Sequence, residues 1–564
     1  MMRQPRRMMT SLTSFVSVVV VLSRPPFTKG LQQRRCPTFH RAPWVTSVMM
    51  QSSTSLPETG YRRLASILQD VSSLEAVSGL LVWDEQVMMP PGSAEFRAAQ
   101  KAALVGVIHE RETSDALCQA IHEARDQWAH LDEWQRAVVR DAERNWQLAH
   151  GVSVELERSI AEQETLGVQA WVDARKKDEW KSFAPHLHES VRLAREYAQA
   201  TRPNLPTYDA LIDIYERGMT SERLATIFDQ IEKPLRKLLQ EILTASSNNS
   251  VMDEIPTALE GSDHWNVDDQ ATLCRSIAGM LGYDFQTGRI DVSAHPFTGG
   301  PGPQDVRITT RYSTGLPFEG IMGTIHEAGH AMYEQGRNKV YTGLPVSEPV
   351  STGVHESQSL FWERMIGQSK EFWDFLLPSV HETFPHTKMV SSEDFYRAIN
   401  RVRRSLIRVD ADEVTYPFHV ILRFKVEKAL FDGSIDVDEL PTVWARLFEE
   451  LIGIPVPTDR EGCLQDVHWA SGAFGYFPSY TLGAMMAAQL FHHLESQAMP
   501  DIRERTKNGD FTFIRDWLHK EIHSKGSLHP SLDELLESAT GEPLNPDYFL
   551  EYLRQKYSVR YGFA

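Results

Sequence analysis

The chain is poor in cysteine and lacks the motifs of several common protein classes. It has four cysteines in 564 residues, spread far apart and without a CxxC pair. This spacing argues against a disulfide framework and against a cysteine-ligated zinc site, so we expect reduced, mostly buried thiols. Zinc-finger spacing, a Walker loop and a glycine-rich dinucleotide fingerprint are also missing from the sequence. Its formal net charge of −18 is the wrong sign for a phosphate-binding surface, so we expect no nucleic-acid partner.

Acidic residues are absent from the first 57 positions, although the chain as a whole is acidic. This stretch holds eight Lys or Arg and is rich in Ser, Thr and Met. Its apolar run from Phe15 to Leu22 is shorter than the roughly 20 residues that span a bilayer, so we expect no membrane span. We interpret residues 1–57 as a disordered import sequence that directs the protein to a plastid or mitochondrion and is then removed. A secretory signal or a mis-assigned start is the alternative.

Residues 58–564 have the pattern of one large, mainly helical catalytic domain. From 58 to 246, apolar residues recur at helical spacing; Leu64, Ile67 and Leu68, for example, share one stripe. After a short interruption the helical pattern resumes and continues to the C-terminus. Strands and helices do not alternate, which makes a doubly wound parallel sheet improbable.

The interruption, between residues 288 and 317, consists of short β-branched runs. Ile290–Val292 and Asp305–Tyr312 flank a Gly/Pro-rich bend at Thr298–Pro303. Two such runs around a bend predict a small antiparallel β-sheet. Because the next helical segment follows at once, we expect the sheet to lie beside that helix.

The most informative segment is Gly320–Tyr333. If it is helical, residues at spacings of four, three and four form one apolar face: Ile321, Ile325, Ala328 and Met332. His326 and His330 then lie together on a different face, at a separation that lets both imidazoles bind one ion. Glu327 follows the first histidine and can reach a water at that ion. This HExxH arrangement is typical of zinc metallopeptidases and predicts amide hydrolysis with Glu327 as general base.

A catalytic zinc site needs a third protein ligand and an open position for water. Glu356 lies thirty residues beyond His326, enough for a loop and an antiparallel return. On spacing alone, Glu356 could equally be an acid in the first turn of an exposed helix, where the helix dipole favours acids. His355 is a rival ligand, but neighbours on a helix point apart, so only one of the two can face the ion.

Further motifs follow one another along the chain. They are Trp83–Gln86 with Met89–Gly92, His295–Phe297 (HPF), Asp305–Thr309 (DxRxT), His326–His330 (HExxH), His355–Gln358 (HESQ), Ile407–Asp412 (IRxxAD), Gly462–Gln465 (GxxQ) and Gly475–Tyr480. In these motifs and their order the chain resembles the carboxypeptidase Taq family of thermostable metallocarboxypeptidases, from about Tyr61 to Gly562. Any one of the motifs is weak, but the full set in family order is very specific.

The resemblance implies a metal site and a reaction. His326, His330 and Glu356 are implied to bind one zinc ion per subunit, with cobalt as the alternative, and Glu327 to be the catalytic base. A mainly helical fold with a long deep substrate groove, a small sheet near the metal and a homodimer are implied as well. Such enzymes remove C-terminal residues with broad specificity. We therefore expect a zinc carboxypeptidase whose substrates are peptides with a free C-terminus.

A buried C-terminal carboxylate needs a cationic partner, and the planar fork of arginine matches it best. Arg408, within the IRxxAD motif, is our candidate, in preference to the arginines that precede it. The predicted oxyanion donor is Tyr480, or alternatively Tyr476. His295 and Arg307 are expected to support the substrate site indirectly.

Two other functions are compatible with the same residues. A related helical oligopeptidase would cut internally and would not need a carboxylate clamp. A catalytically silent groove would bind peptides or a partner protein, although a pure binder has no need of Glu327 beside the metal.

Overall fold

The computed structural model describes residues 59–249, 253–259, 264–315 and 318–563. The predicted import sequence, residues 1–57, lies outside the described residues. The strands are β1 (Gly288–Val292), β2 (Thr298–Gly302) and β3 (Asp305–Thr310). The helices are α1 (Gly60–Val87), α2 (Ala94–Glu112), α3 (Asp115–Asp126), α4 (Glu133–Gly151), α5 (Val154–Lys177), α6 (Trp180–Thr201), α7 (Thr207–Tyr215), α8 (Ser221–Asn248), α9 (Val267–Leu281), α10 (Phe318–Gln335), α11 (Thr352–Leu360), α12 (Lys370–Thr383), α13 (Ser392–Ile399), α14 (Tyr416–Asp432), α15 (Leu440–Ile452), α16 (Pro478–His493), α17 (Ile502–Lys507), α18 (Thr512–Glu521), α19 (Leu532–Thr540) and α20 (Asp547–Tyr561).

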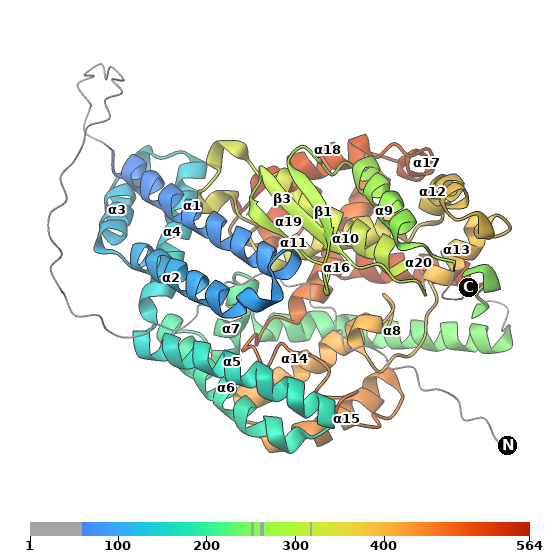
Figure 1. The fold of residues 1–564 in the computed structure, drawn as a ribbon, viewed down its shortest axis with the longest axis horizontal. Coiled ribbons are helices and arrows are strands. Elements are labelled where there is room, and N and C mark those ends of the chain that lie inside the picture. Colours follow the sequence, from blue (N-terminus) through green and yellow to red (C-terminus); the bar gives the residue numbers. More distant parts are fainter. Residues whose placement is uncertain (1–58, 250–252, 260–263, 316–317, 564) are drawn as a thin grey trace, which may run out of the picture.

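The helices surround a small sheet and a central group formed by α10, α11 and α16 (Figure 1). In this view α1 and α2 lie to the left of the sheet, and α5, α6, α14 and α15 form the lower part of the molecule. The prediction of a mainly helical fold with one small sheet is confirmed.

Helix boundaries follow capping chemistry that the sequence encodes locally. Thr59, Ser114, Asp132 and Ser153 precede α1, α3, α4 and α5, and each side chain accepts a hydrogen bond from the backbone N–H three residues on. These bonds satisfy donors that the first helical turn would otherwise leave unpaired. Asp132 and Gln135 form a reciprocal capping box.

The sheet is mixed, so the prediction of a purely antiparallel sheet is wrong. Its strand order is β1-β3-β2, with β1 parallel and β2 antiparallel to β3. The Gly/Pro-rich stretch predicted as a bend is itself strand β2, which runs beside β3. Along the chain, β2 follows β1 and runs in the reverse direction, so β3, which comes next, points the same way as β1. Thr310, at the end of β3, bonds the Gly320 carbonyl oxygen in α10, so the sheet does lie against the motif helix.

The core is centred on α16, which is buried from Pro478 to Phe491. A helix that is apolar on every side requires neighbours all round, and α11, α14, α19 and α20 supply them. Cys274 and Cys463 are buried and Cys118 is partly exposed, and all three are free thiols, as predicted.

Within the described residues, α1 is the one helix long and apolar enough to cross a membrane, and a single such helix is weak evidence for a span. Leu64 belongs to a small core shared with α3 and α4. Trp83, near the other end, lies under the guanidinium of Arg307 from β3, 4.2 Å from the ring centroid. Helix α1 is thus a wall of the domain, attached at both ends.

Candidate metal centre and substrate cavity

Helix α10 gathers two histidines on one face because its opposite face belongs to the core. Ile321, Ile325 and Ala328 are at most 2% exposed and pack in the main apolar cluster. His326 and His330 are left together, with ring centroids 5.0 Å apart. The apolar spacing of the sequence therefore sets the direction in which the imidazoles point.

Close packing of α11 on α10 places Glu356 opposite the two histidines. Gly329 allows this approach, since a Cβ there would lie 2.6 Å from the carbonyl oxygen of Gln358. Glu356 Oε2 lies 3.3 Å from His330 Nε2 and 4.0 Å from His326 Nε2. Ligand atoms around a tetrahedral zinc ion are roughly 3.3 Å apart, because each is about 2 Å from the ion. These three atoms can hold one ion.

The surroundings of His326 fit a bound metal ion. His326 Nε2 is buried and has no hydrogen-bond partner among the described residues. A buried polar atom without a partner is costly, and a metal ion would satisfy it. Two imidazoles and a carboxylate form a donor set that zinc accepts while keeping a position open for water.

The other nitrogens of both histidines are held by hydrogen bonds. His326 Nδ1 lies 2.8 Å from Glu363 Oε2, in the π-helical segment Phe361–Gly367 that continues α11. His330 Nδ1 lies 2.6 Å from His355 Nδ1, and His355 Nε2 lies 3.0 Å from Glu334 Oε1. Such contacts fix the tautomer and the ring orientation of metal-binding histidines. His355 therefore contacts the Nδ1 atom of His330, whereas Glu356 lies next to the Nε2 atoms of both histidines.

The two histidines differ in their affinity for a proton. Burial lowers the pKa of His326, but the hydrogen bond to Glu363 and the charges of Glu356 and Glu363 outweigh it and raise the pKa to about 9. Burial and the neighbouring His355 lower the pKa of His330 to about 4. A metal ligand must be deprotonated, so His330 is ready to bind an ion, whereas His326 must first lose a proton.

Glu327 is held by the sheet. Its side chain is buried, and Thr298 of β2 donates from Oγ1 to Glu327 Oε2 at 2.6 Å. Burial raises the pKa of Glu327 to about 6, against the opposing effects of His326 and Thr298. A carboxylate with a pKa near 6 accepts a proton more readily than an ordinary glutamate does.

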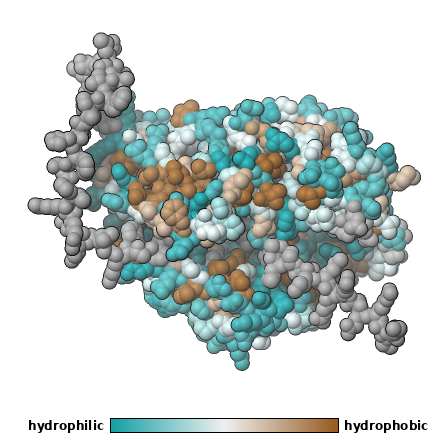
Figure 2. All heavy atoms as spheres, viewed as in Figure 1, coloured by the Kyte–Doolittle hydropathy of each residue, from teal (hydrophilic) through white to brown (hydrophobic). Residues whose placement is uncertain are grey.

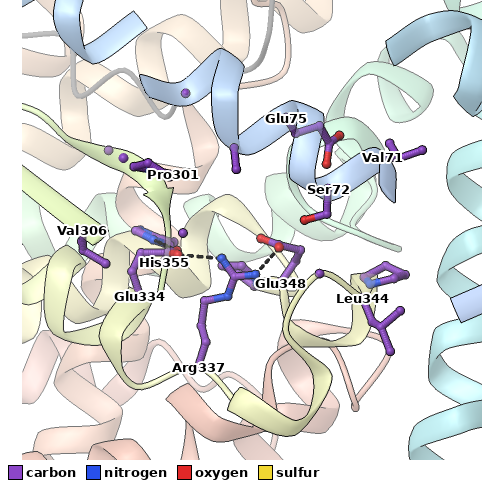
Figure 3. A pocket seen from close by; sticks show the side chains of 18 of the residues that line it. Val71, Ser72, Glu75, Pro301, Val306, Glu334, Arg337, Leu344, Glu348 and His355 are labelled. Carbon is purple, nitrogen blue, oxygen red and sulfur yellow. Dashed lines mark hydrogen bonds and ion pairs between the residues drawn. The ribbon is translucent and has the colours of Figure 1, made fainter. Parts of the chain in front are cut away.

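A cavity of about 540 Å³ opens onto Glu327 and His330. Its walls come from α1, from β2, from α10 and from the segment 343–349. Figure 3 shows Arg337 reaching between Glu334 and Glu348, and Arg337 Nη1 donates to Glu334 Oε2 at 2.7 Å. His330 and several residues of α1 line the same cavity, so the cavity extends from the candidate metal centre to α1. It forms one part of the predicted groove.

The guanidinium of Arg408 lies near the ring of Tyr480, a residue of α16. Its Nε and Nη2 donate to Asp466 Oδ1 at 3.0 and 2.9 Å, and its Nη1 donates to the Tyr416 hydroxyl at 2.6 Å. Its guanidinium carbon is 5.0 Å from the centroid of the Tyr480 ring. Asp466 also binds Arg423 through its second oxygen, so one carboxylate is shared between two buried arginines.

Tyr480 lies on α16, the helix that packs against Glu356, the candidate third ligand. Its hydroxyl lies 3.3 Å from His468 Nε2, and its ring is 5.2 Å from that of Tyr476. Gly483, one turn further on, lies against Glu356, where a Cβ would come within 2.9 Å of Glu356 Cγ. Burial raises the pKa of Tyr480, so its hydroxyl keeps a proton to donate.

Arg307 and His295 belong to the sheet region. Arg307 pairs with Asp305 through two bonds of 2.7 and 2.6 Å and stacks on Trp83. It thereby ties β3 to α1. His295 is half-buried, and burial together with the charge of Arg311 lowers its pKa. Neither residue belongs to the candidate ligand group of His326, His330 and Glu356, and their predicted supporting role stays a prediction.

Three contacts at the site had no counterpart in the sequence analysis. Glu363 bonds His326 across 37 residues, Thr298 bonds Glu327 across 29, and Asp466 bonds Arg408 across 58. None of these separations follows from a helical or strand repeat. A glutamate one or two turns beyond Glu356 on the same helix is the one local signal that would have indicated Glu363.

A family model described as carboxypeptidase Taq (M32) metallopeptidase matches residues 63–557. A thermostable carboxypeptidase 1 of Thermus thermophilus is 37% identical over 520 residues, which cover 90% of this chain and all of that protein. A carboxypeptidase 1 of Bacillus subtilis is 36% identical over 500 residues, covering 88% of this chain and 97% of that one.

Solved structures give the same likeness. Metallocarboxypeptidase 1 of Trypanosoma cruzi has a TM-score of 0.85 and 37% identity, covering 88% of this chain and 99% of that one. An M32 carboxypeptidase from Deinococcus radiodurans has a TM-score of 0.85 and 33% identity, covering 89% and 100%. The residues that the family model matches run from α1 to α20 and include α10 and α11, the two helices that carry the candidate ligands.

Proposed function

Since the chain belongs to the carboxypeptidase Taq (M32) family and is a metallocarboxypeptidase, we propose that it removes C-terminal residues from peptides by a zinc-dependent, glutamate-assisted hydrolysis with broad specificity. The observation that carries this proposal is the convergence of His326 Nε2, His330 Nε2 and Glu356 Oε2 beside Glu327. Membership of the family supports peptide hydrolysis, and the geometry of these four side chains supports their roles as metal ligands and general base.

His326, His330 and Glu356 would hold the metal ion, one per subunit. When bound, the ion supplies Lewis acidity and lowers the pKa of water to roughly 7. Zinc suits a set of two imidazoles and one carboxylate, and cobalt accepts the same donors. Glu363 and His355 orient the imidazoles through their Nδ1 atoms.

Glu327 moves the proton. Held by Thr298 through one oxygen, its carboxylate accepts a proton from the attacking water and delivers it to the amine that leaves. A carboxylate in this role contributes about a hundred- to ten-thousand-fold to the rate. The Tyr480 hydroxyl, protonated and buried, donates a hydrogen bond to the oxyanion that forms, with Tyr476 as the neighbouring alternative.

Arg408 gives the reaction its C-terminal specificity. Asp466 and Tyr416 fix the plane of its guanidinium next to Tyr480. A substrate carboxylate bound there places the last peptide bond beside the ligand atoms. The rest of the peptide then extends past Glu327 into the cavity of about 540 Å³, because Glu327 and His330 line that cavity.

The proposal extends to a homodimer and to an organelle. On α1 and α2 and in the turn between them, exposed apolar side chains gather on one face of the molecule (Figure 2): Val77, Leu80, Met88, Phe96 and Val107. Apolar patches on a protein surface commonly mark contacts with partners, and a second copy of the chain is our proposed partner. The basic composition of residues 1–57 supports import into a plastid or mitochondrion.

The test is residue-by-residue release from a series of model peptides with free C-termini. We expect sequential release of single amino acids, loss of release with a chelator and recovery on adding Zn²⁺ or Co²⁺. Release of internal fragments, or release that survives complete removal of metal, would contradict the proposal.

A further inference from the structure

Glu216 is a buried carboxylate next to the helix that carries the third ligand. It follows α7 directly and is 1% exposed. Its backbone forms an isolated antiparallel bridge with Ser351. One of its carboxylate oxygens, Oε1, accepts a hydrogen bond from the backbone N–H of Gly353, in the first turn of α11. The chain thus brings a charged side chain from α7 to the beginning of α11.

The first turn of α11 is shaped to receive this carboxylate. A Cβ at residue 353 would lie 2.8 Å from Glu216 Oε1, so only glycine leaves room. Ser351 caps the same turn by accepting a hydrogen bond from the Val354 N–H at 3.2 Å. When it is ionised, the Glu216 carboxylate also interacts favourably with the positive end of the helix dipole.

Glu356 lies about one helical turn beyond Gly353, whose backbone N–H donates to Glu216. On its other side, Gly483 of α16 lies against it, since a Cβ there would come within 2.9 Å of Glu356 Cγ and 3.1 Å of the Gly353 carbonyl oxygen. The ligand side chain therefore has little freedom. Its direction depends on where the first turn of α11 is held.

We propose that Glu216 is a positioning residue of the metal centre: by holding the first turn of α11, it aims the Glu356 carboxylate at His326 and His330. This inference rests on the proposed role of Glu356 as a metal ligand. Glu216 does not touch the metal or the substrate, and acts through α11.

The cost of burying this carboxylate indicates that it has a purpose. Burial raises the pKa of Glu216 to about 7, in spite of the hydrogen bond from the Gly353 N–H and the lowering effect of the nearby Ser479 and Ser351 hydroxyls. An uncharged residue would fill the space without that cost. Glu427 offers a matched comparison, because it is also fully buried, has a pKa raised to about 7, and accepts from a backbone N–H, that of Gly475. Glu427 holds a loop that carries no ligand.

The experiment measures metal affinity in the full-length protein. Apo wild type, Glu216→Gln, Glu427→Gln and Glu356→Gln are titrated with Zn²⁺ in competition with a chromogenic chelator, and the Co²⁺ forms are compared by visible absorption. We expect Glu216→Gln to raise the Zn²⁺ dissociation constant by about tenfold or more, the range for residues that orient ligands, and to alter the Co²⁺ spectrum. Glu427→Gln should leave the dissociation constant within twofold of wild type.

The outcomes separate the inference from the proposed function. An unchanged dissociation constant in Glu216→Gln, or an equal rise in Glu427→Gln, would overturn the positioning role. An unchanged constant in Glu356→Gln would overturn the ligand assignment itself. If Glu216→Gln does not fold, Ser351→Ala removes the other acceptor at the same turn; a rise of at least threefold supports the inference, and no rise refutes it.

Discussion

His330 Nδ1 lies 2.6 Å from His355 Nδ1, so the second histidine of the motif is hydrogen-bonded to the residue that precedes Glu356, the proposed third ligand. For His330 to present a lone pair at Nε2, its Nδ1 must carry the proton and donate it to His355. His355 then donates from Nε2 to Glu334. The arrangement selects one tautomer of each ring.

Replacing His355 by Ala is expected to weaken metal binding. Without its partner, the His330 ring gains a second orientation, and loss of such outer contacts typically costs 10- to 100-fold in metal affinity. The Zn²⁺ dissociation constant of the purified variant measures this. His519→Ala, at an exposed position, is the control and should bind Zn²⁺ as wild type does. Equal affinities in all three proteins would refute the role of His355.

Metal binding is expected to strengthen as pH rises towards 9. The pKa of His326 is raised to about 9 in the metal-free protein, so below that pH an ion must displace a proton. Between pH 6 and 9, deprotonation of His326 should therefore raise the association constant for the metal about tenfold for each unit of pH. In Glu363→Gln the pKa of His326 should fall, because the charge of Glu363 is removed. The plot of the association constant against pH should therefore level off at a lower pH. Chelator competition at a series of pH values measures both curves; a flat wild-type curve would contradict the argument.

Replacing Glu327 by Gln should abolish turnover while the metal stays bound. The amide cannot accept the proton, and we expect kcat to fall by about a hundred- to ten-thousand-fold. Metal content, measured by atomic emission on the same samples, should stay at one ion per chain. Turnover retained in this variant would show that Glu327 is not the base.

Arg408→Lys should reduce the preference for a free C-terminus. A charge-assisted hydrogen bond is worth about 1.5–3 kcal/mol, so wild type should hydrolyse a blocked dipeptide at least tenfold faster than its C-terminal amide. The variant should lose this ratio through slower hydrolysis of the acid.

Arg423→Lys is the matched control for this ratio, because Arg423 binds the same carboxylate, Asp466, through its other oxygen. It should alter stability and leave the ratio of acid to amide hydrolysis unchanged. Equal rates on acid and amide in wild type would eliminate the carboxylate clamp, and an oligopeptidase would then explain the site better.

Glu427→Gln should change how stability depends on pH. The pKa of Glu427 is raised from 4.5 to about 7 by burial, so the folded protein binds a proton more tightly than the unfolded chain. The free energy of unfolding therefore falls as pH rises from about 4.5 to about 7, by at most about 3 kcal/mol from this residue. Glu216 contributes a fall of the same sign. Chemical denaturation at pH 5 and pH 7.5 should show a smaller difference in the variant, and an unchanged difference would contradict this assignment.

The sequence predicted those features that repeat locally. The apolar spacing in α10 was enough to place His326 and His330 on one face, and the amphipathic stripes were enough for the helical fold. Spacing alone left Glu356 as one of two readings, because its position depends on how closely α11 packs at Gly329. The family resemblance, and not the spacing, favoured it as a ligand. Strand β2 was missed because Gly and Pro favour bends, whereas pairing with β3 makes Thr298–Gly302 a strand. Contacts across tens of residues, such as that of Glu363 with His326, depend on the assembled core.

The three proposed ligand atoms come from two helices and from positions up to thirty residues apart, so an unfolded chain cannot present them to one ion. Metal and fold are therefore thermodynamically linked: an ion that binds only the native chain stabilises it by about 2.7 kcal/mol at a free concentration one hundred times its dissociation constant. The melting temperature of this enzyme consequently depends on the free metal concentration in the buffer as well as on the chain. Variants compared in trace metal would differ in ion occupancy, and a loss of affinity would be mistaken for a loss of packing.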